Sequence, residues 1–219
     1  IIEDASTDSG TGRWTVIKIP TLSFYEYCQL LQLDDMPLLP DHLKITDIPK
    51  MENAEVADLM ARFEPLVKHF NRYLTIGGFP ELALSDDDLY AQRMLREDVV
   101  DKVIKRDVLT LFKVRSPLLM EKLFLYLCMN STEIFSATTA AKELDNISPN
   151  TIESYVDALV KSNLIYMAYP IAVGSKSVLK GRPKIYIADA AIRNAVLMVD
   201  DVLSDERELG LLIETTVYK

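Results

Sequence analysis

Apolar positions recur every three or four residues along most of this chain, a spacing typical of helices that bury one face. In residues 56–74 the pattern predicts one helical run that Pro65 splits or kinks, because proline lacks the amide hydrogen of the helix interior. Gly77 and Gly78 are expected to end this run, since glycine readily adopts the left-handed conformation found at helix ends. The pattern therefore predicts a mainly α fold.

Capping residues predict the start of two further helices before residue 116. Ser23 and Glu26 form a capping-box pattern, in which each side chain accepts a hydrogen bond from an otherwise unpaired amide. Ser85 with Asp88 predicts the start of a helix that runs towards Arg106. Both helices would precede the most regular part of the chain.

Residues 116–190 contain that regular part. We expect helices over 117–129, 136–144 and 148–161, then β-rich runs at 164–169 and 184–188 with a loop between them. The third helix carries an apolar stripe at i, i+3, i+4, i+7 and i+8: Ile152, Tyr155, Val156, Leu159 and Val160. This order of elements is that of a winged helix. The expected fold class is thus a helical lid-like bundle followed by a winged helix-turn-helix with a small β-hairpin, after which Asp189 and Ser204 cap two last helices.

The composition changes this picture in two ways. The chain has 219 residues, a net charge of -9 and a pI near 4.8, which argues against a general binder of polyanions. No apolar run reaches the roughly 18–20 residues that span a bilayer, so we expect a cytoplasmic location and no membrane contact. Cys28 and Cys128 lie far apart in sequence; free buried thiols are favoured, and a single disulfide stays open.

Complete catalytic signatures are not found in the sequence. The glycine-rich residues 9–13 are too short, and in the wrong order, for the phosphate-binding loop Gly-x-x-x-x-Gly-Lys-Ser/Thr. His42 and His69 have no Cys or His neighbours at metal-ligand spacing. Residues 86–88, three aspartates, are better explained as the first turn of a helix than as metal ligands. We therefore expect no catalytic residue, no metal site and no cofactor within the chain itself.

Several short motifs nevertheless resemble, in order, a family of prokaryotic P-loop ATPases of the AAA+ class. The first is Gly12-Arg13, a predicted strand ending at Pro20, and Leu22-Ser23-Phe24-x-Glu26, which resembles the segment that closes the nucleotide-binding core. The others are Tyr73-Leu74-x-x-Gly77-Gly78-Phe79-Pro80-Glu81, Lys105-Arg106-Asp107-Val108, Ser148-x-Asn150-Thr151-Ile152-x-x-Tyr155, Lys184-x-Tyr186-x-x-Asp189 and Leu209-Gly210-x-Leu212-x-Glu214. Thr21, Tyr27 and Thr215 depart from the family pattern.

The resemblance implies that this chain is the later part of a larger protein whose phosphate loop lies upstream of Ile1. Four parts are then expected: 1–50, the end of the ATPase core and a linker; 51–115, a lid-like helical domain; 116–190, the winged helix; and 191–219, helices leading into a further domain, nuclease-like in such proteins. ATP and Mg²⁺ would bind to the parent protein, and this part alone would hydrolyse nothing. Its expected partners are the missing core, DNA through the wing, and a second copy through the apolar residues 209–217.

The resemblance also assigns candidate site residues. Arg13 and Arg106 are expected near the nucleotide in the parent protein, since a guanidinium suits phosphate oxygens; structural ion pairs are the alternative. Gly77, Gly78 and Pro80 are expected to form a hinge. The candidate nucleic-acid contacts are the four basic residues of the wing: Lys176, Lys180, Arg182 and Lys184.

Two functions stay open at this point. One is the regulatory and binding part of an AAA+ ATP-binding protein, and the other is a stand-alone winged-helix module that binds DNA or protein. The third predicted helix carries Glu153 and Asp157 against Lys161, which is unfavourable for a surface that meets phosphates. Any contact with DNA is therefore expected to be made by the wing and to depend on salt.

Overall fold

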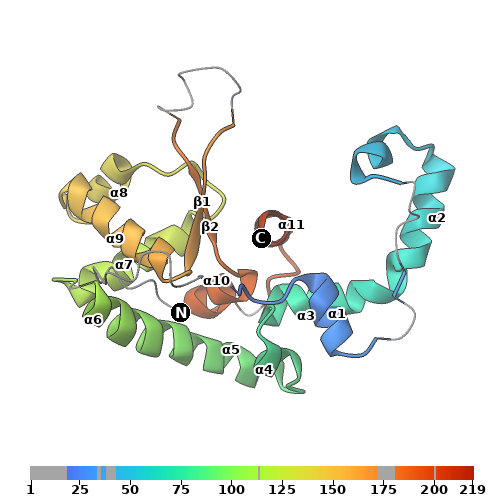
Figure 1. Cartoon of the computed structure of the whole chain (residues 1–219), viewed down its shortest axis with the longest axis horizontal. Helices are drawn as coiled ribbons and strands as arrows, with labels where there is room; N and C mark the ends of the chain where they lie inside the picture. Colours follow the sequence, from blue (N-terminus) through green and yellow to red (C-terminus); the bar gives the residue numbers. More distant parts are fainter. Residues whose placement is uncertain (1–18, 34–35, 38–42, 113, 172–180, 200) are drawn as a thin grey trace, which may run out of the picture.

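The computed structural model describes residues 19–33, 36–37, 43–112, 114–171, 181–199 and 201–219, and these residues form a mainly helical protein with one two-stranded antiparallel hairpin. Figure 1 shows the hairpin projecting from the helical body, with α8 and α9 on one side and α2 standing apart on the other. The predicted strand over residues 14–19 lies outside the described residues, except for Ile19.

The first half of the chain forms a series of short helices. The structure confirms the Ser23–Glu26 capping box at the start of the first helix and the interruption at Pro65. A short helix at the Phe79-Pro80 step was not expected. The elements are α1 (Phe24–Leu30), the 3₁₀ turn η1 (Ile45–Lys50), α2 (Asn53–Phe63), the 3₁₀ turn η2 (Glu64–Leu66), α3 (Val67–Ile76) and α4 (Pro80–Ala83).

The next helix is longer than expected and begins differently. α5 (Asp88–Arg96) continues as the π-helical stretch η3 (Glu97–Val108) and ends in α6 (Leu109–Leu111), the long helix along the lower edge of Figure 1. Its N-cap is Asp87, whose carboxylate accepts from the Tyr90 amide at 2.9 Å. The expectation that Ser85 caps this helix is therefore wrong: the Ser85 hydroxyl bonds to Asp87 itself, at the turn before the helix.

The second half follows the predicted order closely. Helices α7 (Pro117–Met129), α8 (Ala137–Glu143) and α9 (Pro149–Lys161) precede strands β1 (Ile165–Ala168) and β2 (Lys184–Ile187). The strands pair antiparallel, with Tyr166 opposite Tyr186. Ser148 stands at the N-cap of α9 but its hydroxyl makes no capping bond. α10 (Ala190–Leu197) is capped by Asp189 as expected, whereas α11 (Glu206–Tyr218) is capped by Asp205 rather than Ser204.

The centre of the fold is α10, which was expected among the C-terminal helices that lead into a further domain. It packs against α3, α5 and α7, and even its polar residues Arg193 and Asn194 are buried. Arg193 donates to the Cys128 carbonyl at 3.0 Å and to both carboxylate oxygens of Glu208 on α11. One buried apolar cluster runs through α5, α7, α9 and α10, across the predicted boundaries at residues 115 and 190. The division into four parts stays a prediction.

Cys28 and Cys128 are both buried and free, which confirms the favoured interpretation. Burial raises the pKa of both thiols. No helix of the described residues is long and apolar enough to cross a membrane.

Candidate functional site

The turn after α3, formed by Gly77 and Gly78 and called the elbow below, is in close contact with distant parts of the chain at both glycines. Gly77 has φ 77° and ψ -171°, a conformation open essentially to glycine alone. A Cβ at Gly77 would lie 2.3 Å from Oδ1 of Asp189, and one at Gly78 would lie 2.1 Å from the carbonyl oxygen of Leu22. Both glycines are therefore required because other parts of the chain press directly against their backbone.

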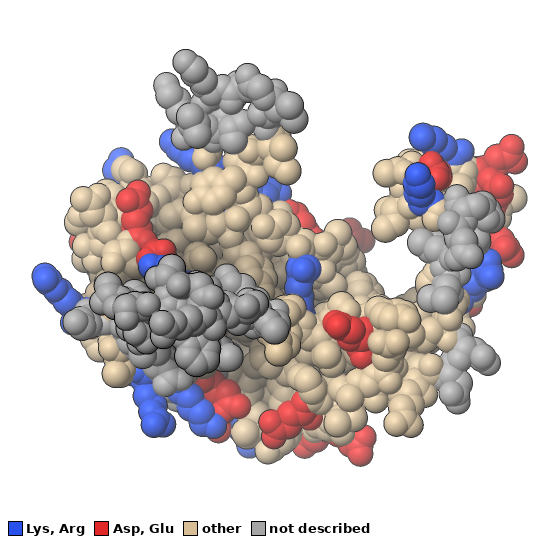
Figure 2. All heavy atoms as spheres, viewed as in Figure 1, with Lys and Arg blue, Asp and Glu red and all other residues tan. Residues whose placement is uncertain are grey.

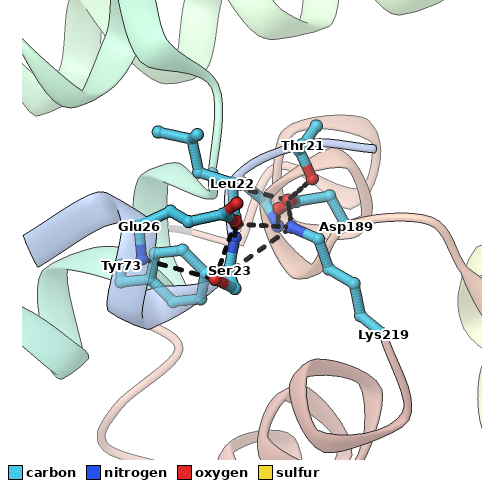
Figure 3. A network of polar contacts seen from close by, with 9 residues as sticks. Thr21, Leu22, Ser23, Glu26, Tyr73, Asp189 and Lys219 are labelled. Atoms are coloured by element: carbon cyan, nitrogen blue, oxygen red, sulfur yellow. Dashed lines mark hydrogen bonds and ion pairs between the residues drawn. The ribbon is translucent and has the colours of Figure 1, made fainter. Parts of the chain in front are cut away.

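Asp189 holds the elbow to the start of the described chain. Its carboxylate is buried, and Oδ2 accepts from the Gly78 amide at 3.1 Å and from the Thr21 hydroxyl at 2.7 Å (Figure 3). Oδ1 accepts from the Ala191 amide at 3.0 Å and so caps α10. One side chain thus joins α10, the elbow and residues 19–23, which we call the strap.

Lys219 supplies the positive charge that balances this carboxylate. Its Nζ lies 2.8 Å from Asp189 Oδ2, and the exposed fractions of the two side chains are 7% and 3%. The same ammonium donates to the Leu22 carbonyl at 2.9 Å and to the Tyr73 hydroxyl at 3.2 Å. A buried charge is tolerated only when it is paired and hydrogen-bonded, and Lys219 meets both conditions here.

Tyr73 completes the cluster from α3. Its hydroxyl donates to the Leu22 carbonyl at 2.6 Å, and its ring packs against Phe24 and Tyr27 of α1. Burial, with the nearby negative charge of Asp189, raises the pKa of Tyr73 well above its usual range. The phenol therefore stays protonated and acts as a donor at any physiological pH.

The strap itself is fixed by the start of α1. Ser23 donates from its amide and its hydroxyl to Glu26 Oε2, both at 2.8 Å, and these bonds hold the pKa of Glu26 below its ordinary value. The Leu22 amide donates to the Gly78 carbonyl at 2.7 Å. The strap is thus bound to the elbow through its backbone as well as through Thr21.

A second polar cluster joins α11 to the hairpin. Lys184 and Tyr186 of β2 both donate to Oε1 of Glu214, at 2.8 and 2.9 Å. The bond from Lys184 lowers the pKa of Glu214. The ring of Tyr218 stacks on Tyr186 with centroids 4.0 Å apart. Leu212 and Thr215 of α11 are buried within this chain, whereas Ile213 and Val217 stay exposed, and the expected contact with a second copy stays a prediction.

The predicted site residues divide into several groups. Arg13, Lys176, Lys180 and His42 lie outside the described residues. Arg106 is exposed on η3, and the hydrogen bonds described above for the elbow do not include it. Gly77 and Gly78 form the elbow, and Pro80 opens α4 just after it. A hinge role for these three residues stays a prediction.

Of the four basic wing residues, the structure describes two. Lys184 is not available as a free cation, because Glu214 from a distant helix pairs with it. Arg182 lines an open cleft of about 1050 Å³ between α9, the hairpin and the end of α11. Apolar residues of the hairpin and α9 form much of its wall, with Glu153 and Asp157 on the α9 side.

Charges are mixed over the described surface. Figure 2 shows basic and acidic residues interspersed on the face viewed in Figure 1, with no broad area of one sign among the residues it colours by charge. His69 is partly buried, and this burial lowers its pKa. Within the described ranges, no three His, Cys, Asp or Glu side chains are grouped so as to hold a metal ion.

Sequence reasoning missed the centre of this site. Asp189 was expected as a helix cap and as the end of a family motif, Thr21 only as a departure from the family pattern, and Lys219 had no assigned role. The available signals were the motif Lys184-x-Tyr186-x-x-Asp189 and the Gly77-Gly78 pair. No local pattern shows that these two segments are in contact. The contact between them is a property of the packed chain.

Fold and site together define a mainly helical protein whose distant segments converge on a buried aspartate–lysine pair. The chain belongs to the family described as "Domain of unknown function (DUF8612)", which matches residues 67–203.

Two curated relatives are similar to it. An uncharacterized protein of Haemophilus influenzae is 24% identical over 187 residues, 84% of this chain and 40% of the relative. An uncharacterized protein of Methanocaldococcus jannaschii is 24% identical over 182 residues, 80% of this chain and 39% of the relative. The chain thus spans about two fifths of the length of each of them. No solved structure matches the chain.

Proposed function

We propose that this chain is the regulatory and binding part of a larger ATP-binding protein of the AAA+ class, in which lid-like helices carry a winged-helix module. The ATP-binding core would be a separate part of the same polypeptide, on the side of the strap. The chain described here would contribute no catalytic residue. Its role would be to pass a movement of the core to the module that binds the partner.

One observation carries this proposal: motifs behind the AAA+ resemblance converge at the elbow. Thr21, beside the Leu22-Ser23-Phe24 motif, and Gly78 contact Asp189 across 168 and 111 positions of sequence. Short motifs that meet in space while lying far apart in sequence are expected where a fold must hold its parts in a fixed relation. A movement of the ATP-binding core would pass to the winged-helix module through this junction of the strap, the lid-like helices and the module.

The winged-helix assignment is supported by a third extended segment. The order α7, α8, α9, β1, β2 is that of a winged helix. Between α7 and α8, the amides of Thr132 and Phe135 donate to the carbonyls of Ile185 and Pro183, at 2.7 and 2.8 Å. The Ile185 amide donates back to the Glu133 carbonyl at 3.1 Å. This pairing adds a third extended segment to the β1–β2 hairpin, as in the small sheet beside the helices of winged-helix domains.

The elbow does not fit the phosphate groups of ATP. A phosphate-binding turn leaves its amides free for the phosphate oxygens, but the Gly78 amide already donates to Asp189. The Cβ positions of the elbow are filled by Asp189 and Leu22. Nucleotide binding is therefore assigned to the core, whose phosphate loop would lie upstream of Ile1, and Arg13, at the end of that core, is the candidate phosphate contact of this chain. No step is assigned to the elbow.

The proposal predicts that Mg²⁺-dependent ATP hydrolysis belongs to the intact protein and not to this chain. A phosphate-binding loop should be encoded upstream of Ile1, and a phosphate-release assay should detect turnover only with that region present. Arg13→Ala in the intact protein should slow hydrolysis more than it weakens nucleotide binding. Hydrolysis by this chain alone, or coding sequence upstream without a phosphate loop, would contradict the proposal.

A second candidate is a stand-alone winged-helix module, and the cleft beside α9 favours it. Arg182 has no acidic partner among the described residues, and it lies at the hairpin end of this cleft. The acidic Glu153 and Asp157 on the α9 wall favour a protein partner over a phosphate backbone.

Duplex DNA binding by this chain should accordingly be weak and should depend on the wing. Lys180→Glu with Arg182→Glu removes two positive charges, so residual affinity and its dependence on salt should both fall in a fluorescence-anisotropy titration. Lys50→Glu together with Lys68→Glu, at exposed positions of η1 and α3 outside the winged-helix residues, is the charge-matched control. An unchanged affinity in the wing variant would exclude DNA contact through the wing.

A further inference from the structure

The strap and α11 share their binding partners at the elbow. The Leu22 carbonyl accepts from both Tyr73 and Lys219, so the strap supplies one of the acceptors that keep the buried ammonium satisfied. Asp189 Oδ2 accepts from Thr21, Gly78 and Lys219 at once. Figure 3 shows Thr21, Leu22 and Lys219 meeting around Asp189. The strap and the end of α11 therefore share Asp189, and Lys219 also takes one of its acceptors from the strap.

The other contacts of α11 lead to the hairpin. Glu214 binds Lys184 and Tyr186, and Tyr218, next to Lys219, stacks on Tyr186. A displacement of the end of α11 therefore disturbs β2 directly. A continuous series of contacts runs from the strap, through Lys219, to the strands beside the cleft.

We propose that the strap and α11 bind the elbow cooperatively, so that withdrawal of the strap loosens α11 and releases its hold on the hairpin. Withdrawal of Leu22 would leave Lys219 Nζ with fewer acceptors in a buried site, which makes its insertion less favourable. Coupling of this kind is reciprocal, since loss of Lys219 must loosen the strap by the same factor. Its use as a nucleotide-driven switch rests on the proposed function, in which the ATP-binding core adjoins the strap.

Amide hydrogen exchange of the whole chain tests the coupling in both directions. Thr21→Val removes one donor to Asp189, and exchange in α11 and β2 should become about tenfold faster, while α8 keeps its rate. Lys219→Met should accelerate exchange of the Leu22 amide, which donates to Gly78, by a similar factor beyond any acceleration in α8. Thr110→Val is the matched control, because its hydroxyl donates to the Arg106 carbonyl at 2.7 Å on an exposed surface outside the cluster.

Two results would overturn the inference. Each variant could accelerate exchange only in its own segment, which would mean that strap and α11 bind independently. Alternatively, α8 could accelerate as much as α11, which would mean a general loss of stability. Failure here leaves the ATP proposal standing, because hydrolysis by the intact protein is measured separately. Confirmed coupling in a protein without an upstream phosphate loop would leave the inference standing and remove the ATPase proposal.

Discussion

Asp189→Asn is expected to lower the free energy of unfolding by about 3–5 kcal/mol, because it leaves the buried Lys219 ammonium without its counter-charge. Asparagine caps helices as well as aspartate does, so the start of α10 should be preserved and the loss assigned to the charge. Urea denaturation followed by circular dichroism measures the change. A loss below about 1 kcal/mol would mean that the pair is not buried in solution.

Asp157→Asn is the matched control for this experiment. It makes the same chemical change in an exposed pair with Lys161, whose side chains are 58% and 39% exposed, and should cost less than about 0.5 kcal/mol. The double variant Asp189→Asn with Lys219→Met removes both charges. It should be more stable than the sum of the single effects predicts, with a coupling of about 1–3 kcal/mol.

Gly78→Ala and Gly77→Ala should each destabilise the protein by about 3 kcal/mol, and both should detach the strap. At Gly78 the new methyl group would meet the Leu22 carbonyl at 2.1 Å, so the bonds from the Leu22 amide and to its carbonyl must break. At Gly77 the methyl group meets Asp189 at 2.3 Å, and the backbone conformation adds strain of its own. Thermal and urea unfolding measure the loss.

Gly210→Ala is the control for these two variants and should have the opposite effect on stability. This glycine is exposed in α11, and a Cβ there would meet nothing within 4 Å. Alanine should therefore stabilise the helix by about 0.5–1 kcal/mol through its better helix propensity. If all three alanine variants behaved alike, the close approach of strap and aspartate to the elbow would be wrong.

Local patterns were enough to predict most elements of this fold. The capping box at Ser23, the interruption at Pro65 and the apolar stripe of α9 each depend on residues within a few positions of one another. Where such prediction was wrong, a competing residue lay within two positions of the predicted one. Asp87 caps α5 in place of Ser85, and Asp205 caps α11 in place of Ser204.

The basic residues of the wing show that neighbours in the sequence do not reveal which charges are paired in the folded protein. Lys184 is in a segment without acidic residues, and the sequence therefore suggested a basic surface. Glu214 lies 30 positions away and binds it in the folded protein. Likewise, nothing near α10 in sequence indicates that this helix lies at the centre of the core between α3, α5 and α7.

The amino-acid sequence by itself determined most of the helices, several of their caps and the hairpin, because backbone preferences and apolar periodicity act over a few residues. Only the tertiary structure decided that Asp189 lies against this elbow and that Thr21 and Lys219 meet it there. The stability of a buried charge depends on which distant segments exclude water from it and supply its partners. That condition exists only after the chain has packed.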